Sequence, residues 1–345
     1  MGKMLFIHPA NDFTGSTRVL QNIIKNEYLS YSKAIFTIDG GTGLLSELEN
    51  VRIYNIWFPR FHGKKIPGVS VLISYIYRIV LLFFLCFKYD CFYVNTVIPS
   101  YAIVVLSVLH KKTIWHIHEI LPNDGFVNTF RNGIVRKAKA HFIFVSNYVA
   151  DAYTINKLST QEVRYNKLGK EFTNKIVINP CSNRSRNRVL MVASLSPFKG
   201  IPVFLEVARK MKSYHFTLVL GSSEQEVDTF LVDNNIPDNC EVLHQVNELF
   251  GVYYNNDVLL NLTDPSLRKE TFGMTIIEAF AYGIPAIAPN AGGPREIIDN
   301  GLNGLMVDVT NSDTVINSIS YILDDQMRYE AFSNNAYKAS LRFKY

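Results

Sequence analysis

The stretch over residues 268–285 reads R-K-E-T-F-G-M-T-I-I-E-A-F-A-Y-G-I-P, and it decides the fold. The apolar residues after Gly273 predict a buried helix that ends at Gly283, because glycine commonly closes a helix in the left-handed conformation. Glu270 precedes this helix and Glu278 lies inside it, so at about 1.5 Å of rise per residue the two carboxylates are spread along a ligand. This spacing argues against a hydrolase, in which two carboxylates flank one bond.

The surroundings of Glu278 mark this carboxylate as a candidate functional group. Apolar residues flank it on both sides within 276–280, and a charge in such a context needs a partner or a ligand. The alternative is an ordinary glutamate on a helix surface. The backbone amides of Phe272, Gly273 and Met274 lie where the helix begins, and the start of a helix attracts anions. The segment therefore predicts an anion site beside two carboxylates.

Outward from this segment, short β-rich runs alternate with helical stretches along the whole chain. The runs predicted as strands are 4–8, 33–38, 51–57, 90–95, 113–118 and 141–146 in the first half, and 188–193, 216–220, 241–244, 258–262, 285–288 and 304–307 in the second. Near-continuous apolar strands separated by helices predict parallel sheets that are covered on both faces. Two such sets predict an α/β protein of two doubly wound, Rossmann-like domains with a cleft between them.

A polar, turn-rich segment without periodicity separates the two sets of strands. It reads N-P-C-S-N-R-S-R-N over residues 179–187. The sequence therefore predicts a first domain over 1–180 and a second over 187–330, followed by a closing segment at 331–345.

The composition excludes several classes of protein. The chain has 345 residues, of which 48% are hydrophobic and 19% charged, which is neither a disordered nor a fibrous composition. The four cysteines show no C-x-x-C spacing, which argues against a zinc ribbon or a thioredoxin-type site and fits a reducing compartment. No G-x-G-x-x-G follows a predicted strand, which disfavours a nicotinamide dehydrogenase. The start of the chain lacks a signal pattern, so we expect a cytoplasmic protein.

Charge is distributed unevenly between the two halves. Residues 1–180 hold 21 lysines and arginines against 11 acidic residues, a net charge of +10, whereas residues 181–345 hold 14 against 19, a net of −5. The overall charge of +5 is too mild to predict a nucleic-acid partner. The basic half favours a membrane surface or a phosphorylated acceptor, and unevenly charged solvated surfaces are the alternative.

The most hydrophobic stretch, residues 69–87, is 19 residues long with Arg78 near its middle. An arginine at a bilayer centre costs at least about 2.5 kcal/mol, so the stretch predicts a core helix or an interfacial helix rather than a transmembrane span. Tyr75, Tyr77, Arg78 and Lys88 would suit a surface at the level of lipid headgroups.

The E-x7-E spacing, followed by A-F-A-Y-G-I-P-A-I-A, resembles the signature of family 4 retaining glycosyltransferases, which have the GT-B fold. Residues 188–202, R-V-L-M-V-A-S-L-S-P-F-K-G-I-P, and residues 290–300, N-A-G-G-P-R-E-I-I-D-N, are similar to the family's flanking segments. The resemblance implies that 1–180 binds the acceptor, that 187–330 binds a nucleotide-sugar, and that 331–345 leads back toward the first domain. It implies no cofactor beyond the nucleotide-sugar co-substrate.

The resemblance also assigns roles to residues of the second half. Glu278 would bind ribose hydroxyls, Glu270 sugar hydroxyls and Lys199 the diphosphate. The donor would also contact the backbone around the helix start and a residue at the nucleobase; these are Phe272, Gly273, Met274, Thr275 and Val246. A lysine and a helix start stabilise a leaving diphosphate without metal, and no D-x-D spacing stands out, so we expect no metal site.

One position departs from the family pattern. Ser194 stands where family members usually carry arginine, so one of two expected phosphate cations is missing. Serine donates a hydrogen bond but carries no charge. Arg268 or Lys269 would supply the missing charge, unless both are solvated loop cations.

The first half resembles the family more loosely. Gly15, Ser16 and Thr17 occupy the place of the family's glycine-rich loop, on the acceptor side, although a plain turn with Ser16 as helix cap is an alternative. The segment W-H-I-H-E ends another predicted strand, and alternation places His116 and His118 on one side. His118 matches a family histidine near the transferred sugar, which makes it a catalytic candidate with Glu270 and Lys199. His116 and Glu119 are acceptor-side candidates.

The reading that follows is a retaining glycosyltransferase that moves a hexosyl or N-acetylhexosaminyl group from a nucleotide-diphosphate donor to a saccharide or lipid-linked saccharide. The resemblance implies a role in surface polysaccharide biosynthesis and a peripheral contact with the cytoplasmic face of the inner membrane. We expect no nucleic-acid partner. A sugar-nucleotide epimerase of similar architecture and a non-catalytic sugar-nucleotide-binding subunit are the alternatives.

Overall fold

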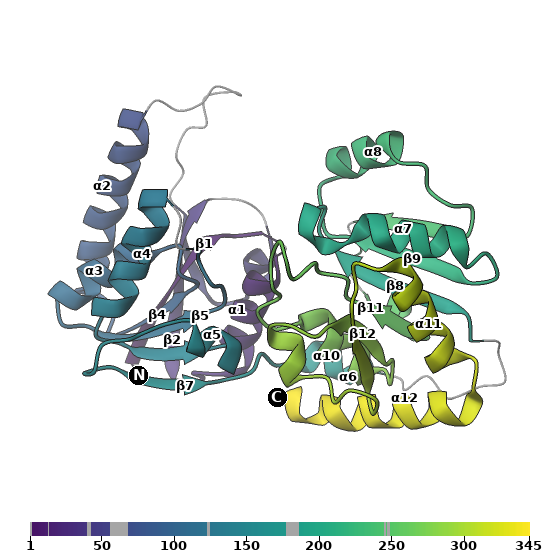
Figure 1. The fold of residues 1–345 in the computed structure, drawn as a ribbon. Helices are drawn as coiled ribbons and strands as arrows, with labels where there is room; N and C mark the ends of the chain where they lie inside the picture. Colours follow the sequence, from purple (N-terminus) through teal and green to yellow (C-terminus); the bar gives the residue numbers. More distant parts are fainter. Residues whose placement is uncertain are drawn as a thin grey trace. The chain divides into compact units, whose positions relative to one another are not determined.

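The protein consists of two compact α/β units, Met1–Tyr165 and Asn166–Tyr345 (Figure 1). The structure is a computed structural model, and it describes residues 2–12, 14–39, 43–55, 68–122, 125–176, 186–244, 246 and 249–345. Each unit contains one parallel sheet, as the apolar strands separated by helices predict.

The first unit is built on a seven-stranded parallel sheet with the order β3-β2-β1-β4-β5-β6-β7. Its strands are β1 (Gly2–Ala10), β2 (Tyr31–Asp39), β3 (Arg52–Asn55), β4 (Cys91–Asn95), β5 (Lys112–Ile117), β6 (His141–Phe144) and β7 (Thr160–Val163). Its helices are α1 (Gly15–Asn26), η1 (Leu44–Glu47), α2 (Gly68–Leu85), α3 (Ser100–Val108), α4 (Gly125–Lys137) and α5 (Asn147–Asp151). The order reverses between β1 and β4, which makes their carboxyl ends the topological switch point.

The second unit is built on a six-stranded parallel sheet with the order β10-β9-β8-β11-β12-β13. Its strands are β8 (Arg188–Ala193), β9 (His215–Leu220), β10 (Cys240–His244), β11 (Val258–Leu260), β12 (Ala286–Pro289) and β13 (Gly304–Val307). Its helices are α6 (Lys170–Asn174), η2 (Pro197–Lys199), α7 (Ile201–Lys210), α8 (Glu224–Asp233), α9 (Phe250–Tyr254), α10 (Met274–Ala281), η3 (Gly293–Glu296), α11 (Ser312–Leu323), α12 (Gln326–Ser340) and η4 (Leu341–Phe343). Here the switch point lies between β8 and β11.

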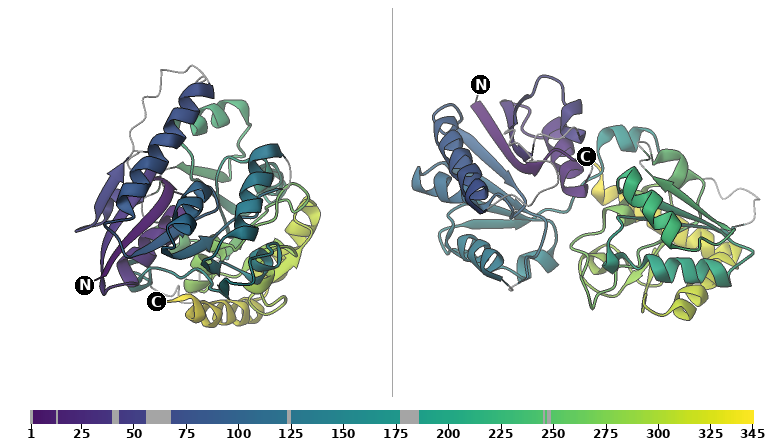
Figure 2. Two further views of the ribbon diagram at one scale, coloured as in Figure 1. Left: turned by 90° about the vertical axis from the view of Figure 1, so that its left-hand side faces the viewer. Right: turned by 90° about the horizontal axis from the view of Figure 1, so that it is seen from above.

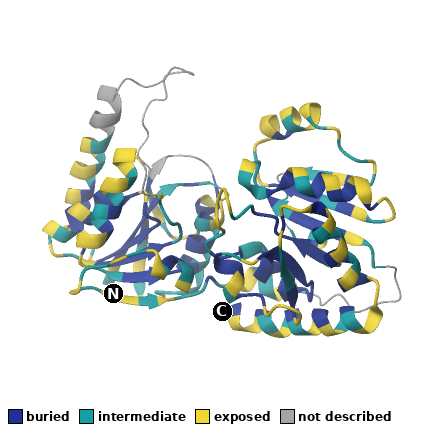
Figure 3. Ribbon diagram, in the orientation of Figure 1, coloured by how far each residue is buried: buried dark blue, intermediate teal, exposed yellow. Residues whose placement is uncertain are grey.

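Both sheets are sandwiched between helices, as Figure 2 shows, and their central strands are almost fully buried. Every residue of β4, β11 and β12 is buried (Figure 3). Strands buried on both faces become continuous apolar runs, which explains why the sequence announces most of them clearly.

The helix predicted after Gly273 forms as α10. Gly273 precedes its first residue with φ at +118°, and Gly283 follows its end with φ at +70°. Both backbone angles belong to the left-handed region, which glycine enters without a steric penalty. The prediction of two doubly wound, Rossmann-like α/β domains is confirmed.

The division between the units differs from the sequence prediction of a first domain over 1–180. Residues 166–176 pack with the second unit, where the Phe172 ring meets the rings of Tyr253 and Tyr282 edge-on. Leu168 pairs with Lys344, near the other end of this unit. The predicted break at 179–187 lies mostly outside the described residues, and α12 packs against α10 within the second unit.

Among the described residues, no helix combines the length and the apolar character that crossing a membrane requires. The hydrophobic stretch 69–87 forms most of α2 and the turn after it.

Candidate functional site

The candidate donor residues of the second unit gather at the carboxyl ends of β8 and β11. Lys199 follows β8 at the end of the short helix η2, and Thr263 follows β11. Open parallel sheets bind ligands at this reversal of strand order, because the loops from the two strands diverge there. The predicted catalytic pair is therefore placed where the fold offers a site.

Lys199 and Glu270 form an ion pair in this place. The Lys199 Nζ donates to Glu270 Oε2 at 2.7 Å, and both side chains are partly buried. The Thr263 hydroxyl donates to the same carboxylate oxygen at 3.5 Å. A charge-assisted hydrogen bond of this length holds the ammonium in one position, ready to meet an anion.

Tight backbone packing fixes the position of Glu270. The Gly293 amide donates to the Glu270 carbonyl oxygen at 2.8 Å. A Cβ on Gly292 would lie 2.2 Å from the same oxygen, and the φ of Gly292 is +65°. Only glycine fits such an approach, so the glycine pair after β12 braces the loop that carries Glu270.

Glu278 lies deeper in the unit, on α10. Its side chain is only 5% exposed, and Oε2 accepts a hydrogen bond from the Tyr253 hydroxyl at 2.7 Å. The Tyr253 ring stacks on Tyr282, with centroids 5.6 Å apart. Burial, and then the Glu278 carboxylate, raise the pKa of Tyr282 to about 12. Glu278 is therefore buried, as its apolar neighbours in the sequence indicate, and the Tyr253 hydroxyl is its hydrogen-bond partner.

Ser194 and Arg268 are two further donor-side candidates. The Ser194 and Ser196 hydroxyls lie 3.0 Å apart after β8. The Arg268 guanidinium lies over the Phe198 ring, 5.1 Å from its centroid, and Lys199 contacts the same ring at 5.6 Å. Arg268 is thus held close to Lys199.

The other residues assigned to the donor are present but less constrained. Lys269 is exposed, whereas Phe272 and Gly273 are buried beside the start of α10. Met274 and Thr275 open that helix and are half-buried, as is Val246 after β10.

A chain of hydrogen bonds runs across the switch point of the first unit. His118 Nε2 lies 2.9 Å from Asn95 Oδ1, and the Asn95 amide nitrogen lies 3.0 Å from His8 Nδ1. His8 Nε2 in turn lies 2.9 Å from the Thr17 hydroxyl, which donates to Asp12. Because an amide oxygen only accepts and an amide nitrogen only donates, Asn95 sets the tautomers of both histidines.

Burial keeps these histidines neutral. It lowers the pKa of His8 to about 4, against the attraction of Asp12. It lowers the pKa of His118 to about 3, with His8 acting in the same direction. Burial, and then His118 and Arg164, lower the pKa of His116 well below 6.5. Neutral imidazoles can donate from one nitrogen and accept at the other.

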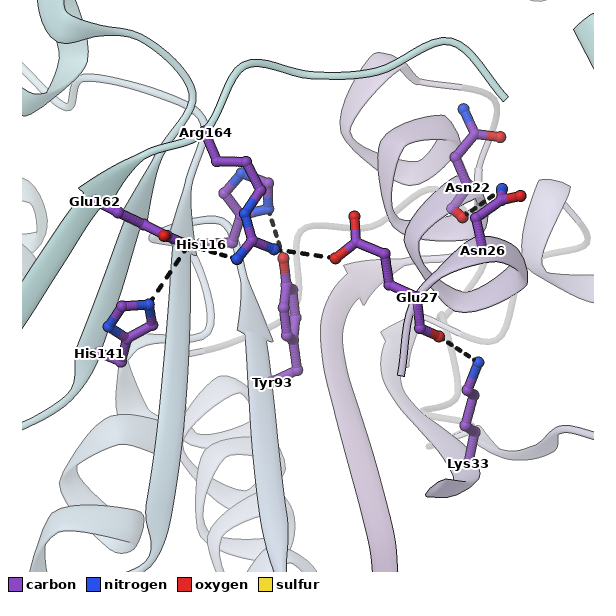
Figure 4. A network of polar contacts seen from close by, with 9 residues as sticks. All are labelled: Asn22, Asn26, Glu27, Lys33, Tyr93, His116, His141, Glu162 and Arg164. Carbon is purple, nitrogen blue, oxygen red and sulfur yellow. Dashed lines mark hydrogen bonds and ion pairs between the residues drawn. The ribbon is translucent and has the colours of Figure 1, made fainter. Parts of the chain in front are cut away.

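His116 belongs to a second polar network, shown in Figure 4. Its Nδ1 lies 2.8 Å from the Tyr93 hydroxyl, and its ring centroid is 4.1 Å from that of His118. Arg164 lies nearby, in an ion pair with Glu27 at 3.0 Å and in contact with Glu162. The predicted placement of both histidines on one side of the strand is confirmed. The Arg164 cation lies close enough to contribute to the lowered pKa of His116.

A strained turn separates Asn95 from the helix that follows. Thr96 has a φ of +73°, a left-handed conformation that β-branched residues rarely adopt. Its amide donates to the His116 carbonyl oxygen, and its carbonyl oxygen accepts from the Trp115 indole. Glu119 accepts from the Val97 amide at 2.8 Å, and burial raises its pKa. Strain held in this way is typical of functional sites.

The three candidates around the start of α1, which are Gly15, Ser16 and Thr17, differ in burial and in their contacts. Gly15 begins α1 and is exposed, whereas Thr17 is fully buried in the hydrogen-bonded chain. Thr14, rather than Ser16, is the residue at the N-cap. The Ser16 carbonyl oxygen accepts from Asn95 at 3.2 Å, which joins the loop to the chain.

Sequence reasoning missed Asn95, His8, Tyr253 and Thr263. Asn95 ends β4, His8 lies near the end of β1, and Thr263 comes three residues after β11, so the rule that ligands bind at carboxyl ends of strands would have found them. Tyr253 lies on α9 with no local signal, because its partner is 25 residues away.

Asn95→Leu should disconnect the two histidines with little change of side-chain volume. Two buried ring nitrogens would lose their partners, at about 1–3 kcal/mol each in the free energy of unfolding. Urea unfolding checks this through tryptophan fluorescence, because both tryptophans belong to the first unit. Asn26→Leu, on the surface of α1, is the control. Equal stabilities of the two variants would contradict the linking role.

The described part of the chain places no group of three or more histidine, cysteine, aspartate or glutamate side chains where they could hold a metal ion.

Comparison with known proteins matches residues 176–339 to the family model of glycosyl transferases group 1. An uncharacterized glycosyltransferase of Methanocaldococcus jannaschii is 26% identical over 87% of this chain and 83% of its own length. Anabaena HepE, solved with UDP-glucose, superimposes with a TM-score of 0.79 at 19% identity, over 100% of this chain and 96% of that one.

A sucrose-phosphate synthase from Thermosynechococcus elongatus also superimposes with a TM-score of 0.79, at 16% identity, over 100% of this chain and 95% of that one. Such likenesses show a shared fold. Residues 176–339 therefore match a glycosyl transferases group 1 domain, and the chain as a whole has the GT-B fold.

Proposed function

We propose that the protein transfers a hexosyl or N-acetylhexosaminyl group, with retention, from a nucleoside-diphosphate sugar to a hydroxyl of a saccharide or lipid-linked saccharide. The observation that carries this proposal is the Lys199–Glu270 pair at the switch point of the second unit. It combines a cation for a diphosphate with a carboxylate for sugar hydroxyls, and the fold offers its ligand site there.

Each donor residue has a distinct task in this proposal. Lys199 would meet the charge that develops on the leaving diphosphate, and the start of α10 would add its backbone amides without a metal ion. Glu270 would accept hydrogen bonds from the sugar. Glu278, held by Tyr253, would accept from the ribose hydroxyls. Arg268, whose guanidinium lies over the Phe198 ring, would supply the cation that Ser194 lacks.

The first unit would handle the acceptor. His118 is neutral and its Nε2 points to Asn95, which leaves Nδ1 as the acceptor atom for a substrate hydroxyl. Surface polysaccharide assembly at the cytoplasmic face of a membrane is the setting that we propose. The structure of Anabaena HepE with UDP-glucose supports a nucleotide-sugar as donor.

A panel of nucleoside diphosphates and their sugars, tested by thermal shift, identifies the donor because a ligand stabilises the state that binds it. We expect Glu278→Ala to lose the shift given by the nucleoside diphosphate. Glu270→Ala should keep that shift and lose the extra stabilisation by the sugar.

Incubation of the identified donor with and without acceptors then separates the alternatives. Conversion of the sugar without acceptor would indicate an epimerase, and binding without any turnover would indicate a non-catalytic subunit. Equal shifts for both variants and the wild type would reject the donor site.

A further inference from the structure

The first unit carries an apolar surface on three neighbouring helices, α2, α3 and α4. In α2, Ile76, Val80, Phe83 and Phe84 are all exposed and follow the spacing i, i+4, i+7 and i+8. This spacing places them on one face of the helix, and here that face is turned to solvent. Among these four side chains, Phe84 is the most exposed, at 60%. A surface helix normally presents polar side chains to solvent, whereas this face of α2 presents apolar ones.

The neighbouring helices extend the surface. Val104 and Val108 are exposed on α3, which packs between α2 and α4. On α4, Phe126 is 86% exposed and its ring stacks on Phe130, with centroids 6.3 Å apart. Contiguous apolar patches on a protein surface mark sites of interaction with proteins or membranes. These residues of α2, α3 and α4 are called the apolar face below.

Arg78, which by its sequence position would suit the level of lipid headgroups, is half-buried on α2. Its guanidinium lies over the Tyr75 ring, 5.6 Å from the centroid, and that ring meets Tyr101 edge-on. Tyr101 is buried on α3, so the half-buried Arg78 lies on the side of α2 that meets α3. The charge inside the hydrophobic stretch is thereby partly shielded from solvent.

Basic residues border the apolar face at one edge. All strands of the sheet are parallel, so α2, α3 and α4 all end at the edge where β4, β5 and β6 begin. Exposed cations lie there, and they are Lys88, Lys112, Arg136, Lys137 and Lys139. The three helices contain no aspartate or glutamate. These five cations are called the basic rim.

We propose that the apolar face and the basic rim dock the first unit onto an anionic lipid bilayer. Aromatic and aliphatic side chains would enter the boundary between headgroups and acyl chains, and the basic rim would meet lipid phosphates. A second copy of the chain fits less well, because the same helices offer no carboxylate to pair with the rim. The proposal deepens the proposed function, since a lipid-linked acceptor would be presented at that surface, but its test does not depend on transfer.

Flotation with lipid vesicles tests the proposal on the full chain. The wild type should float with vesicles of phosphatidylcholine and phosphatidylglycerol, less with phosphatidylcholine alone, and less as salt is raised. Phe84→Asp and Phe126→Asp should each weaken binding at least about tenfold, because each removes apolar area and adds a charge of the wrong sign. Lys137→Glu should weaken only the binding to anionic vesicles.

Matched controls come from the second unit. Val232 is 85% exposed, and Lys212 is exposed, so Val232→Asp and Lys212→Glu should leave flotation unchanged. Turnover with a water-soluble acceptor should be unchanged in every variant, which separates this proposal from the proposed function. All substituted positions are exposed, and equal thermal midpoints of the variants and the wild type would exclude misfolding as the cause of weaker flotation.

Three results would overturn the proposal. The first is no flotation of the wild type with anionic vesicles, and the second is equal flotation of the wild type and both phenylalanine variants. The third is a wild-type dimer that Phe84→Asp dissociates without any vesicle binding, which would assign the apolar face to a second copy. Equal binding to neutral and anionic vesicles would remove the basic rim from the surface.

Discussion

Lys199→Ala should lower kcat/KM by about 100- to 1,000-fold with the identified donor and acceptor. The ammonium is the cation that Glu270 holds at 2.7 Å, and removing one fixed charge that stabilises a transition state has an effect of that size. Steady-state kinetics measure it, and the thermal shift by the bare nucleoside diphosphate should fall with it. Lys212→Ala, at an exposed lysine of the same unit, is the control.

Arg268 and Ser194 refine this expectation. If Arg268 supplies the second phosphate charge from its place over Phe198, Arg268→Ala should lose almost as much diphosphate affinity as Lys199→Ala. Ser194→Arg in the Arg268→Ala background should then restore part of it. Activity of Lys199→Ala within twofold of the wild type would exclude the lysine from the reaction.

The first unit should lose stability steeply in weak acid. The native pKa values of His8, His116 and His118 lie below 6.5, so the unfolded chain binds protons that the native unit refuses. Their stabilising effect is therefore complete above about pH 6.5 and is lost as the pH falls toward the native values. The slope is about 1.4 kcal/mol per pH unit for each proton.

Glu119 opposes this effect, because its raised native pKa makes the native unit take up one proton early. We therefore expect a net slope smaller than the three histidines alone would give, which is about 4 kcal/mol per pH unit. Urea unfolding followed by tryptophan fluorescence reports it. His8→Asn should reduce the slope by about one proton, whereas His215→Asn, exposed in the second unit, should not change it. A flat profile for the wild type would contradict the burial of these histidines.

The fold was predictable because burial on both faces leaves a simple pattern in the sequence. The run predicted at 188–193 is β8 to the residue, and it is almost wholly apolar. The strand β7, T-Q-E-V, was missed because it lies at the edge of the sheet, where polar side chains face solvent. Edge strands lack the period and the hydrophobicity that mark central ones.

The site was predictable where its residues are close in the sequence. Glu270, Gly273 and Glu278 lie in one loop and helix, and their spacing resembles a family signature that implies a common ligand. The link between Asn95 and His8 spans 87 residues and exists only because β1 and β4 are neighbours in the sheet. Local patterns do not encode such pairs, which arise when the strand order is fixed. The roles of these residues stay predictions until the variants are made.

The packing of residues 166–176 with the second unit decides where the chain can be recombined. A chimaera that joins this first unit to the second unit of another protein at residue 180 would separate Leu168 from Lys344 and Phe172 from Tyr253 and Tyr282. The foreign domain would then lack a helix that closes its own aromatic cluster. A junction between Tyr165 and Asn166 transfers α6 together with the rings that it covers, so the second unit can be exchanged as one intact module.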